Sequence, residues 1–102
     1  MRPSFVLVRV DLSPRWNLPR GNWKETRQQC WEILQRCVYL DKDLVLPPMG
    51  TGGTTETFFV VAATDLQHSG IMTTRIREQL LRVRDFKDKC ALTITAVPIE
   101  FA

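Results

Sequence analysis

Residues 43–64 read DLVLPPMGTGGTTETFFVVAAT and predict two strands, near 42–46 and 56–64, joined by a glycine-rich hairpin. The first apolar run is ended by Pro47-Pro48, and a longer apolar run follows the glycines. A turn of about two residues is enough to pair two antiparallel strands. The connection here is much longer, and loops that exceed the structural minimum tend to carry function. The tip of the hairpin is therefore the first candidate for a functional site.

The segments before the hairpin predict a strand and a helix. Residues 4–12 are rich in apolar and β-branched side chains, which is typical of a central strand buried on both faces. Asn22 is a suitable N-cap, and from 23 to 38 apolar side chains recur at three- and four-residue spacing. This pattern predicts an amphipathic helix of about four turns that ends near Tyr39 to Asp41.

The segments after the hairpin predict a second helix and a last strand. Residues 65–70 are polar and turn-like, and apolar residues within 71–83 mark an amphipathic helix. A charged connection at 85–89 leads to 90–101, where apolar and polar side chains alternate. The order βαββαβ predicts an α+β, ferredoxin-like domain with a four-stranded antiparallel sheet and two helices on one face. The whole chain, 1–102, is expected to form this one domain.

The composition is that of a globular domain without a transmembrane segment. Hydrophobic residues make up 44% of the 102 residues and charged residues 25%, and the longest apolar run is far too short to span a bilayer. Residues 1–10 show no cleavage pattern of a signal peptide, which favours the cytoplasm as the default location. The formal net charge of +3 permits an acidic partner without requiring one.

The three cysteines are expected to be buried thiols. Cys30 and Cys37 are seven positions apart in the predicted first helix, a separation of roughly 10 Å that is too long for a disulfide. Cys90 lies in a different element, and the sequence has no CxxC motif and one histidine, His68. This pattern argues against a structural zinc site, and we expect no cofactor.

The hairpin offers groups for an anion or a metal ion. Its candidate contacts for a nucleotide or a partner are Gly50, Gly52, Gly53, Thr54, Thr55 and Glu56. Backbone amides of such a run could cradle a phosphate, but no GKS or GKT follows, so it is not a P-loop; a flexible hairpin tip is the alternative. Asp11, at the end of the first strand, could meet Glu56 as a carboxylate pair for a divalent cation. A loop-capping role is the alternative for Asp11.

Arginines on the predicted second helix are the other candidate contact surface. Arg75, Arg77 and Arg82 could face an anion, although a solvated basic face is the alternative interpretation. The single histidine has no cysteine or acid at a catalytic spacing, so no Ser-His-Asp or Cys-His arrangement can be built. The sequence offers no complete catalytic set, and we expect no enzyme activity.

The chain contains, in order, LVRVDL, an amphipathic helix, DLVL, a glycine-containing hairpin, ETFFVVAATDL, IMTTRIREQLL and LTITAVPI. This succession resembles the GGDEF (diguanylate cyclase) domain over about residues 4–99. Residues 75–80 (RIREQL) and 93–97 (TITAV) match a helix and a strand typical of that family. Members bind GTP through the signature hairpin and hold Mg²⁺ with an Asp of the first strand and an acid of the signature. The resemblance thus implies a nucleotide cyclase-like fold with Asp11 and the hairpin at its site.

Departures from the family pattern imply a degenerate, non-catalytic relative. The chain reads TTETF at 54–58, where the family has two acids and Phe directly after its glycines. If Gly52-Gly53 match those glycines, the loop has two extra residues. If Glu56 instead matches the first acid, Thr57 stands where the family has its second acid. No RxxD inhibitory site precedes the hairpin, and the family's final helix, which contacts the triphosphate, has no counterpart in the sequence. Losing an acid, the loop geometry and the cationic clamp together should abolish phosphoryl transfer.

These observations predict a non-catalytic regulatory or protein-interaction domain in bacterial signal transduction. Its partner would be another protein domain, with a homodimer as one form, and neither a membrane nor nucleic acid is expected. Residual binding of GTP or cyclic di-GMP at Asp11 and the hairpin is one alternative. The other is a nucleic-acid-binding module, because this topology also supports RNA recognition by aromatic side chains on an open sheet face. Phe58 and Phe59 are adjacent and point to opposite faces, so one of them could serve there.

Overall fold

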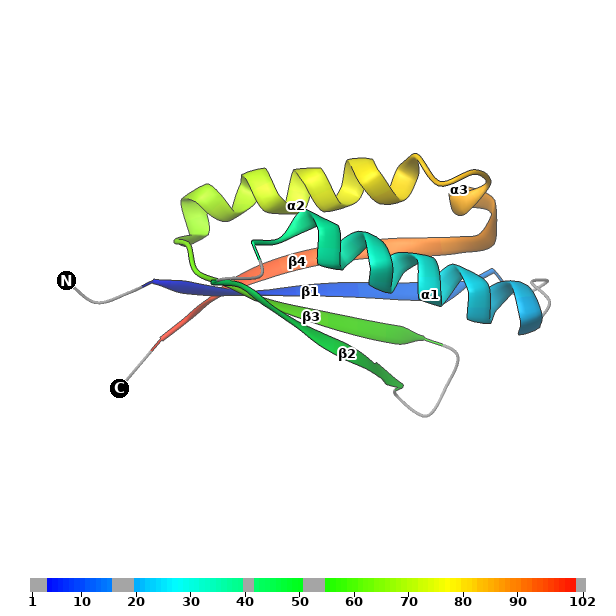
Figure 1. The fold of residues 1–102 in the computed structure, drawn as a ribbon, viewed down its shortest axis with the longest axis horizontal. Coiled ribbons are helices and arrows are strands. Elements are labelled where there is room, and N and C mark those ends of the chain that lie inside the picture. Colours follow the sequence, from blue (N-terminus) through cyan, green and yellow to red (C-terminus); the bar gives the residue numbers. More distant parts are fainter. Residues whose placement is uncertain (1–3, 16–19, 40–41, 51–54, 101–102) are drawn as a thin grey trace.

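The chain folds into a four-stranded antiparallel sheet with two long helices on one face (Figure 1). The computed structural model describes residues 4–15, 20–39, 42–50 and 55–100. The elements in chain order are β1 (Phe5–Pro14), α1 (Arg20–Cys37), β2 (Leu44–Gly50), β3 (Glu56–Ala62), α2 (Leu66–Leu81), α3 (Phe86–Lys89) and β4 (Cys90–Ile99). The strands lie in the order β2-β3-β1-β4, and neighbouring strands are antiparallel. The predicted βαββαβ arrangement is confirmed.

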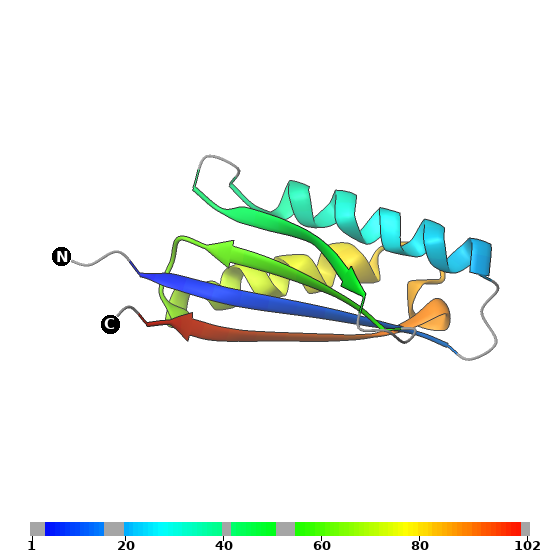
Figure 2. The same ribbon diagram turned by 90° about the horizontal axis from the view of Figure 1, so that it is seen from below.

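β1 is a central strand, but only one of its faces is covered. Its even-numbered residues from Val6 to Leu12 are fully buried, whereas Leu7 is partly exposed and Arg9 is exposed. Seen from below in Figure 2, the sheet lies in front of α2, α1 runs along the β2 side, and no described element covers the near face. The prediction that the strand is buried on both faces is therefore wrong, because both long helices pack on the same face. We call the other side the open face.

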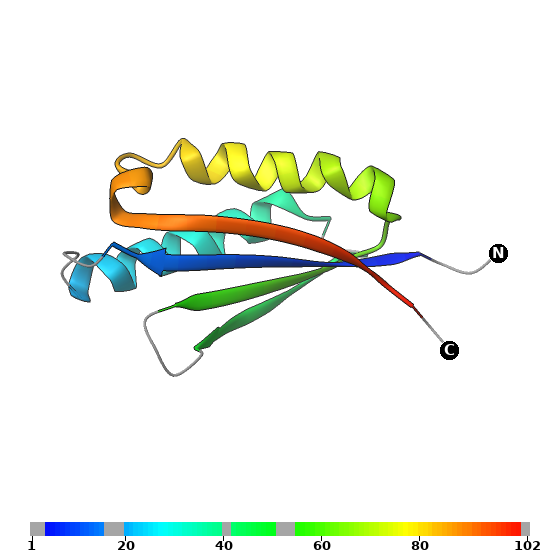
Figure 3. The ribbon, with the colours of Figure 1, turned by 180° about the vertical axis from the view of Figure 1, so that it is seen from behind.

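The core fills the layer between the sheet and the two long helices. Phe58 of β3 is the largest fully buried side chain, and Leu34 of α1 and Ile76 and Leu80 of α2 share its layer. Seen from behind in Figure 3, α2 runs along β4 on the covered face. No helix within the described ranges is long and apolar enough to cross a membrane.

The three cysteines are buried in this core and form no disulfide, as predicted. Burial raises the pKa of the Cys30 and Cys37 thiols, and it raises the pKa of Cys90 to about 11. The thiols therefore remain protonated near neutral pH and pack as small apolar side chains.

α2 begins earlier than its apolar periodicity predicts. Its first residue is Leu66, because the Asp65 carboxylate accepts a hydrogen bond from the His68 amide at 2.7 Å and caps the helix. The His68 ring also bonds to this carboxylate, and the two contacts with His68 lower the pKa of Asp65. Most of the segment 65–70, predicted to be a turn, is thus the beginning of the helix.

Two other connections also differ from prediction. α1 begins at Arg20, so Asn22 lies inside the helix and is not its N-cap. Residues 86–89, predicted as part of a charged connection, form the short helix α3 and bury Phe86. A single aromatic residue among charged ones gives no helical pattern of apolar residues, so the sequence does not predict this helix. The burial of Phe86 nevertheless closes one end of the core.

β2 is longer than predicted. The strand continues through Pro47-Pro48 to Gly50, with an irregularity in its pairing to β3 between Leu46 and Met49. Prolines are tolerated there because β2 is an edge strand.

Candidate functional site

Asp11 lies near the end of β1 with its carboxylate on the open face. Its Oδ1 accepts a hydrogen bond from the Thr57 hydroxyl at 2.6 Å, and both of its oxygens accept from Arg9 Nε, at 3.1 and 2.9 Å. Thr57 stands directly opposite Asp11 in the pairing of β1 with β3. Both oxygens of the carboxylate therefore already have partners, one on β1 itself and one on β3.

Glu56 lies on the covered face of the sheet. It stands opposite Leu12, which is buried under the helices, so its side chain points toward α1. Arg27 Nη1 of α1 donates to Glu56 Oε1 at 2.7 Å, and only 12% of the Glu56 side chain is exposed. Trp31 and Pro47 line the shallow cleft around this ion pair.

The structure does not bring the carboxylates of Asp11 and Glu56 together. Consecutive residues of a strand point to opposite faces, so of Glu56 and Thr57 only Thr57 can face Asp11. An acid at position 57 would meet the Asp11 carboxylate, whereas the threonine donates a hydrogen bond to it. In the part of the chain that the structure describes, no three His, Cys, Asp or Glu side chains gather where they could hold a metal ion.

The hairpin candidates are described only at the two strand ends. Gly50 ends β2 opposite Glu56, and Thr55 Oγ1 lies 3.2 Å from Ser13 Oγ of β1. Three of the candidates lie outside the described residues: Gly52, Gly53 and Thr54.

The three arginines of the predicted basic surface point in different directions. Arg75 faces α1, where its Nη1 donates to the Cys37 carbonyl at 3.3 Å and its guanidinium lies 5.9 Å from the centroid of the Tyr39 ring. Arg77 is two positions further along, about 200° around the helix, and is exposed. Arg82 is the exposed C-cap residue of α2. These side chains therefore do not form one continuous contact surface.

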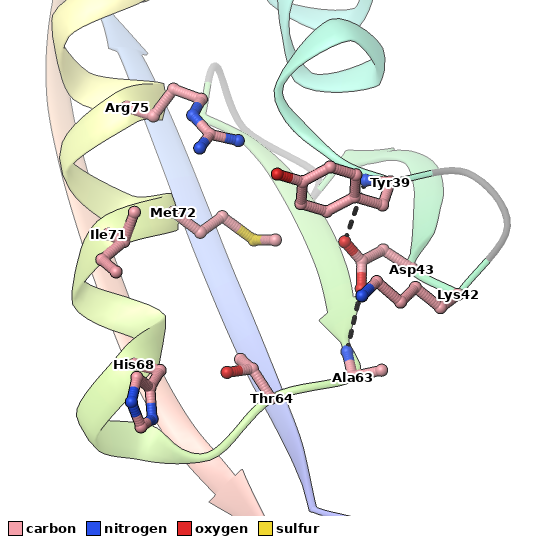
Figure 4. Close-up of a pocket in the computed structure, with 9 residues that line it drawn as sticks. All are labelled: Tyr39, Lys42, Asp43, Ala63, Thr64, His68, Ile71, Met72 and Arg75. Carbon is pink, nitrogen blue, oxygen red and sulfur yellow. Dashed lines mark hydrogen bonds between the residues drawn. The ribbon is translucent and has the colours of Figure 1, made fainter.

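A pocket of about 220 Å³ lies between the end of α1 and the first half of α2 (Figure 4). Tyr39, Lys42 and Asp43 line it from the α1–β2 connection, Ala63 and Thr64 from the end of β3, and α2 supplies the remaining wall. Three segments that are distant in the sequence build it. Sequence reasoning singled out only Arg75 among its residues, because such a convergence leaves no local motif.

Asp43 fixes one wall of this pocket. Its side chain is buried, with Oδ2 accepting from the Tyr39 amide at 3.0 Å and Oδ1 from the Ala63 amide at 2.9 Å. Figure 4 shows these two bonds joining the end of α1 to the end of β3. The buried acid thus joins the Tyr39 wall of the pocket to the wall at the end of β3.

An apolar row crosses all four strands on the open face. It consists of residues that stand opposite one another in the strand pairing: Leu44, Val61, Leu7 and Val97. At the two edges of the sheet, Leu44 is 56% exposed and Val97 is 52% exposed. An extended apolar surface on a single chain commonly marks a contact with another molecule.

The rows on either side extend this surface. Toward the hairpin, Leu46 and Phe59 continue it, followed by Arg9 on β1. On the other side, Phe5 stands opposite Ile99. The sequence contained the signal for this surface. Where a strand is apolar throughout and only one face of the sheet is covered, every second apolar side chain must lie on the exposed face.

Comparison with known proteins identifies the fold class but no family. No protein-family model and no curated protein sequence matches the chain. Among solved structures, the de novo designed ferredoxin-fold protein LFR1 1 is similar, with a TM-score of 0.57, 17% identity, and coverage of 90% of this chain and 83% of that one. The chain therefore has a ferredoxin-like α+β fold.

Two larger proteins contain a similar unit. A hydantoinase/carbamoylase family amidase from Burkholderia ambifaria matches with a TM-score of 0.58 and 13% identity over 95% of this chain, which spans 28% of the amidase. A VAO-type flavoprotein from Myceliophthora thermophila C1 matches with a TM-score of 0.58 and 13% identity over 95% of this chain, which spans 18% of the flavoprotein. At these identities the likeness concerns the fold alone.

Proposed function

We propose that the chain is a non-catalytic, GGDEF-like interaction domain of a cytoplasmic signalling system, and that it contacts other proteins through the open face of its sheet. The observation that carries the proposal is the apolar row of Leu44, Val61, Leu7 and Val97. The row itself is aliphatic and buries well against protein, whereas nucleic-acid bases stack on aromatic platforms, of which the open face offers only Phe59 and Phe5 beside the row, among the described residues. A protein partner is therefore favoured over RNA.

The arrangement of the acids supports the absence of catalysis. Phosphoryl transfer depends on metal ions and charged groups that converge on the phosphates. Here Asp11 and Glu56 point to opposite faces, and each is bonded to groups of its own chain. With GTP and Mg²⁺ the chain is accordingly expected to form no cyclic di-GMP above the level of a protein-free control, as followed by chromatography of the nucleotides. Turnover that disappears in the Asp11→Ala variant would overturn this part of the proposal.

The partner that fits the open face best is a second copy of the chain. Two strands of ten residues and two of seven, spaced about 4.8 Å apart, present roughly 540 Å², which is about two thirds of the ~800 Å² that each partner buries in a standard interface. Two copies related by a two-fold axis would bury the apolar row against itself, with the sheets packed face to face at about −30°. Such packing removes the exposed side chains of Leu44 and Val97 from water.

Substitution of Val97 by glutamate tests this interface. In sedimentation velocity the unmodified chain is expected to be a dimer. Val97→Glu should weaken the dimer by at least about 100-fold, because one buried unpaired carboxylate already costs about 3 kcal/mol and the two-fold dimer would bury two. Leu66→Glu is the matched control, since Leu66 is also an exposed apolar residue, at 48%, but lies on α2. It should leave the dimer intact. A monomer at every concentration, or equal effects of the two variants, would exclude the second copy as the partner.

A further inference from the structure

Hydrogen bonds from backbone amides hold the described walls of the pocket between α1 and α2 in place. Besides the two amides bonded to Asp43, the Tyr39 carbonyl accepts hydrogen bonds from the amides of Lys42 and Asp43, at 3.0 and 2.7 Å. These bonds set the position of Tyr39 beside α2. A recess formed before binding spares a ligand the cost of ordering it.

Two cations lie on different sides of one aromatic ring at this recess (Figure 4). Lys42 Nζ lies 5.1 Å and the Arg75 guanidinium 5.9 Å from the centroid of the Tyr39 ring. Neither cation forms an ion pair with a described carboxylate. The negative charge of Asp43 is directed to two backbone amides. Arg75 uses one of its donors on the Cys37 carbonyl, which leaves others for a bidentate contact with an oxyanion.

The rest of the recess is apolar, with a polar far end. Met72 and Ile71 of α2 lie beside Arg75, and His68 and Thr64 lie at the opposite end of the view in Figure 4. Arg75 and His68 are seven residues apart on the helix, a distance of about 10 Å along its axis. The volume of about 220 Å³ is below the range of about 300–1,000 Å³ that drug-sized ligands occupy. The recess is therefore suited to a short molecule with one charged end.

We infer that this pocket binds a small organic oxyanion, a phosphate ester or a carboxylate that carries a compact apolar group. Arg75 contacts the oxyanion, the Tyr39 hydroxyl adds a donor beside Arg75, Lys42 on the other side of the ring adds positive charge, and the apolar group lies against Met72 and Ile71. This site is separate from the open face, because it lies on the helix-bearing side of the sheet (Figures 1 and 4). A ligand could therefore act as an input to a domain whose protein contacts are elsewhere.

The sequence provides two unique reporters for a binding test. Tyr39 is the only tyrosine and His68 the only histidine of the chain, so the ring signals of each are unambiguous in nuclear magnetic resonance spectra. Titration with phenyl phosphate or benzoate is expected to shift both sets of ring signals in a saturable manner, and the tighter of the two ligands identifies the preferred anion. Inorganic phosphate and phenol should each bind more weakly than phenyl phosphate, because each lacks one half of the ligand.

Charge-removing variants locate the oxyanion. Arg75→Gln is expected to weaken phenyl phosphate binding by about tenfold or more, which is the loss expected when a charge-assisted hydrogen bond is removed. Lys42→Gln should weaken it by less, because that charge acts from the other side of the Tyr39 ring. Arg82→Gln, a loss of the same charge at the far end of α2, should leave the affinity unchanged. Unfolding in urea confirms that each variant is folded. The inference is overturned if neither phenyl phosphate nor benzoate gives a saturable shift at Tyr39, if Arg75→Gln and Arg82→Gln bind equally, or if inorganic phosphate or phenol matches phenyl phosphate.

Discussion

Replacement of Phe58 by alanine is expected to lower the free energy of unfolding by about 3–5 kcal/mol. Phe58 is fully buried and is the largest of the fully buried side chains within the described residues. It projects from β3 into the layer beneath α1 and α2, so its removal costs both the transfer of the ring to water and the cavity left behind. Because domains of this kind have a total stability of about 5–15 kcal/mol, the variant would retain little of it. Urea denaturation followed by tryptophan fluorescence, at one fixed protein concentration, measures the change.

The neighbouring residue supplies the control for this substitution. Phe59 has the same side chain but points to the open face, where it remains partly exposed. Phe59→Ala is expected to cost less than about 2 kcal/mol, because less area is returned to water. Both variants are measured in the Val97→Glu background, where the proposed dimer is weakened. Equal losses of stability there would contradict the assignment of the covered and open faces, and with it the description of the apolar row.

Much of the fold follows from local patterns in the sequence. The apolar periods distinguish helices from strands, and their order suffices for the βαββαβ topology. The boundaries that failed depend on single side chains. Asp65 caps α2 and so lets the helix begin earlier in the sequence than the apolar period predicts. Phe86 is buried at the end of the core, and the helical turn α3 begins at this residue. Neither effect changes the hydrophobic period, and so neither is visible in it.

The candidate site was less predictable than the fold. It depends on which face of the sheet each strand residue points to, and on contacts between segments that are distant in the sequence. Asp11 and Glu56 are close along the paired strands, yet the register places them on opposite faces. A shift of one residue in the pairing of β1 with β3 would have placed Asp11 and Glu56 on the same face. Sequence patterns do not specify the register to within one residue near a long loop. The pocket beside Tyr39 is harder still, since Asp43 joins segments twenty positions apart. Only the folded chain brings Lys42 and Arg75 to the same ring.

Replacement of Asp43 by alanine is expected to lower the free energy of unfolding by about 2–6 kcal/mol. The Asp43 side chain is 8% exposed, and its two oxygens accept from the amides of Tyr39 and Ala63. Alanine would leave both donors without a partner in a partly buried place, and each such loss costs about 1–3 kcal/mol. Urea denaturation gives the global loss, and amide hydrogen exchange at Tyr39 and Ala63 gives the local one.

Asparagine at the same position separates the two bonds. Its side chain keeps a single oxygen acceptor, so Asp43→Asn should satisfy one amide and fall between alanine and the unmodified chain in stability. Because these bonds also fix the Tyr39 wall of the pocket, Asp43→Ala should reduce phenyl phosphate binding even though Arg75 and Lys42 are unchanged. Unaltered stability together with continued protection of both amides would show that the carboxylate does not hold the two elements together, and the pocket would then lack the rigidity on which its binding role depends.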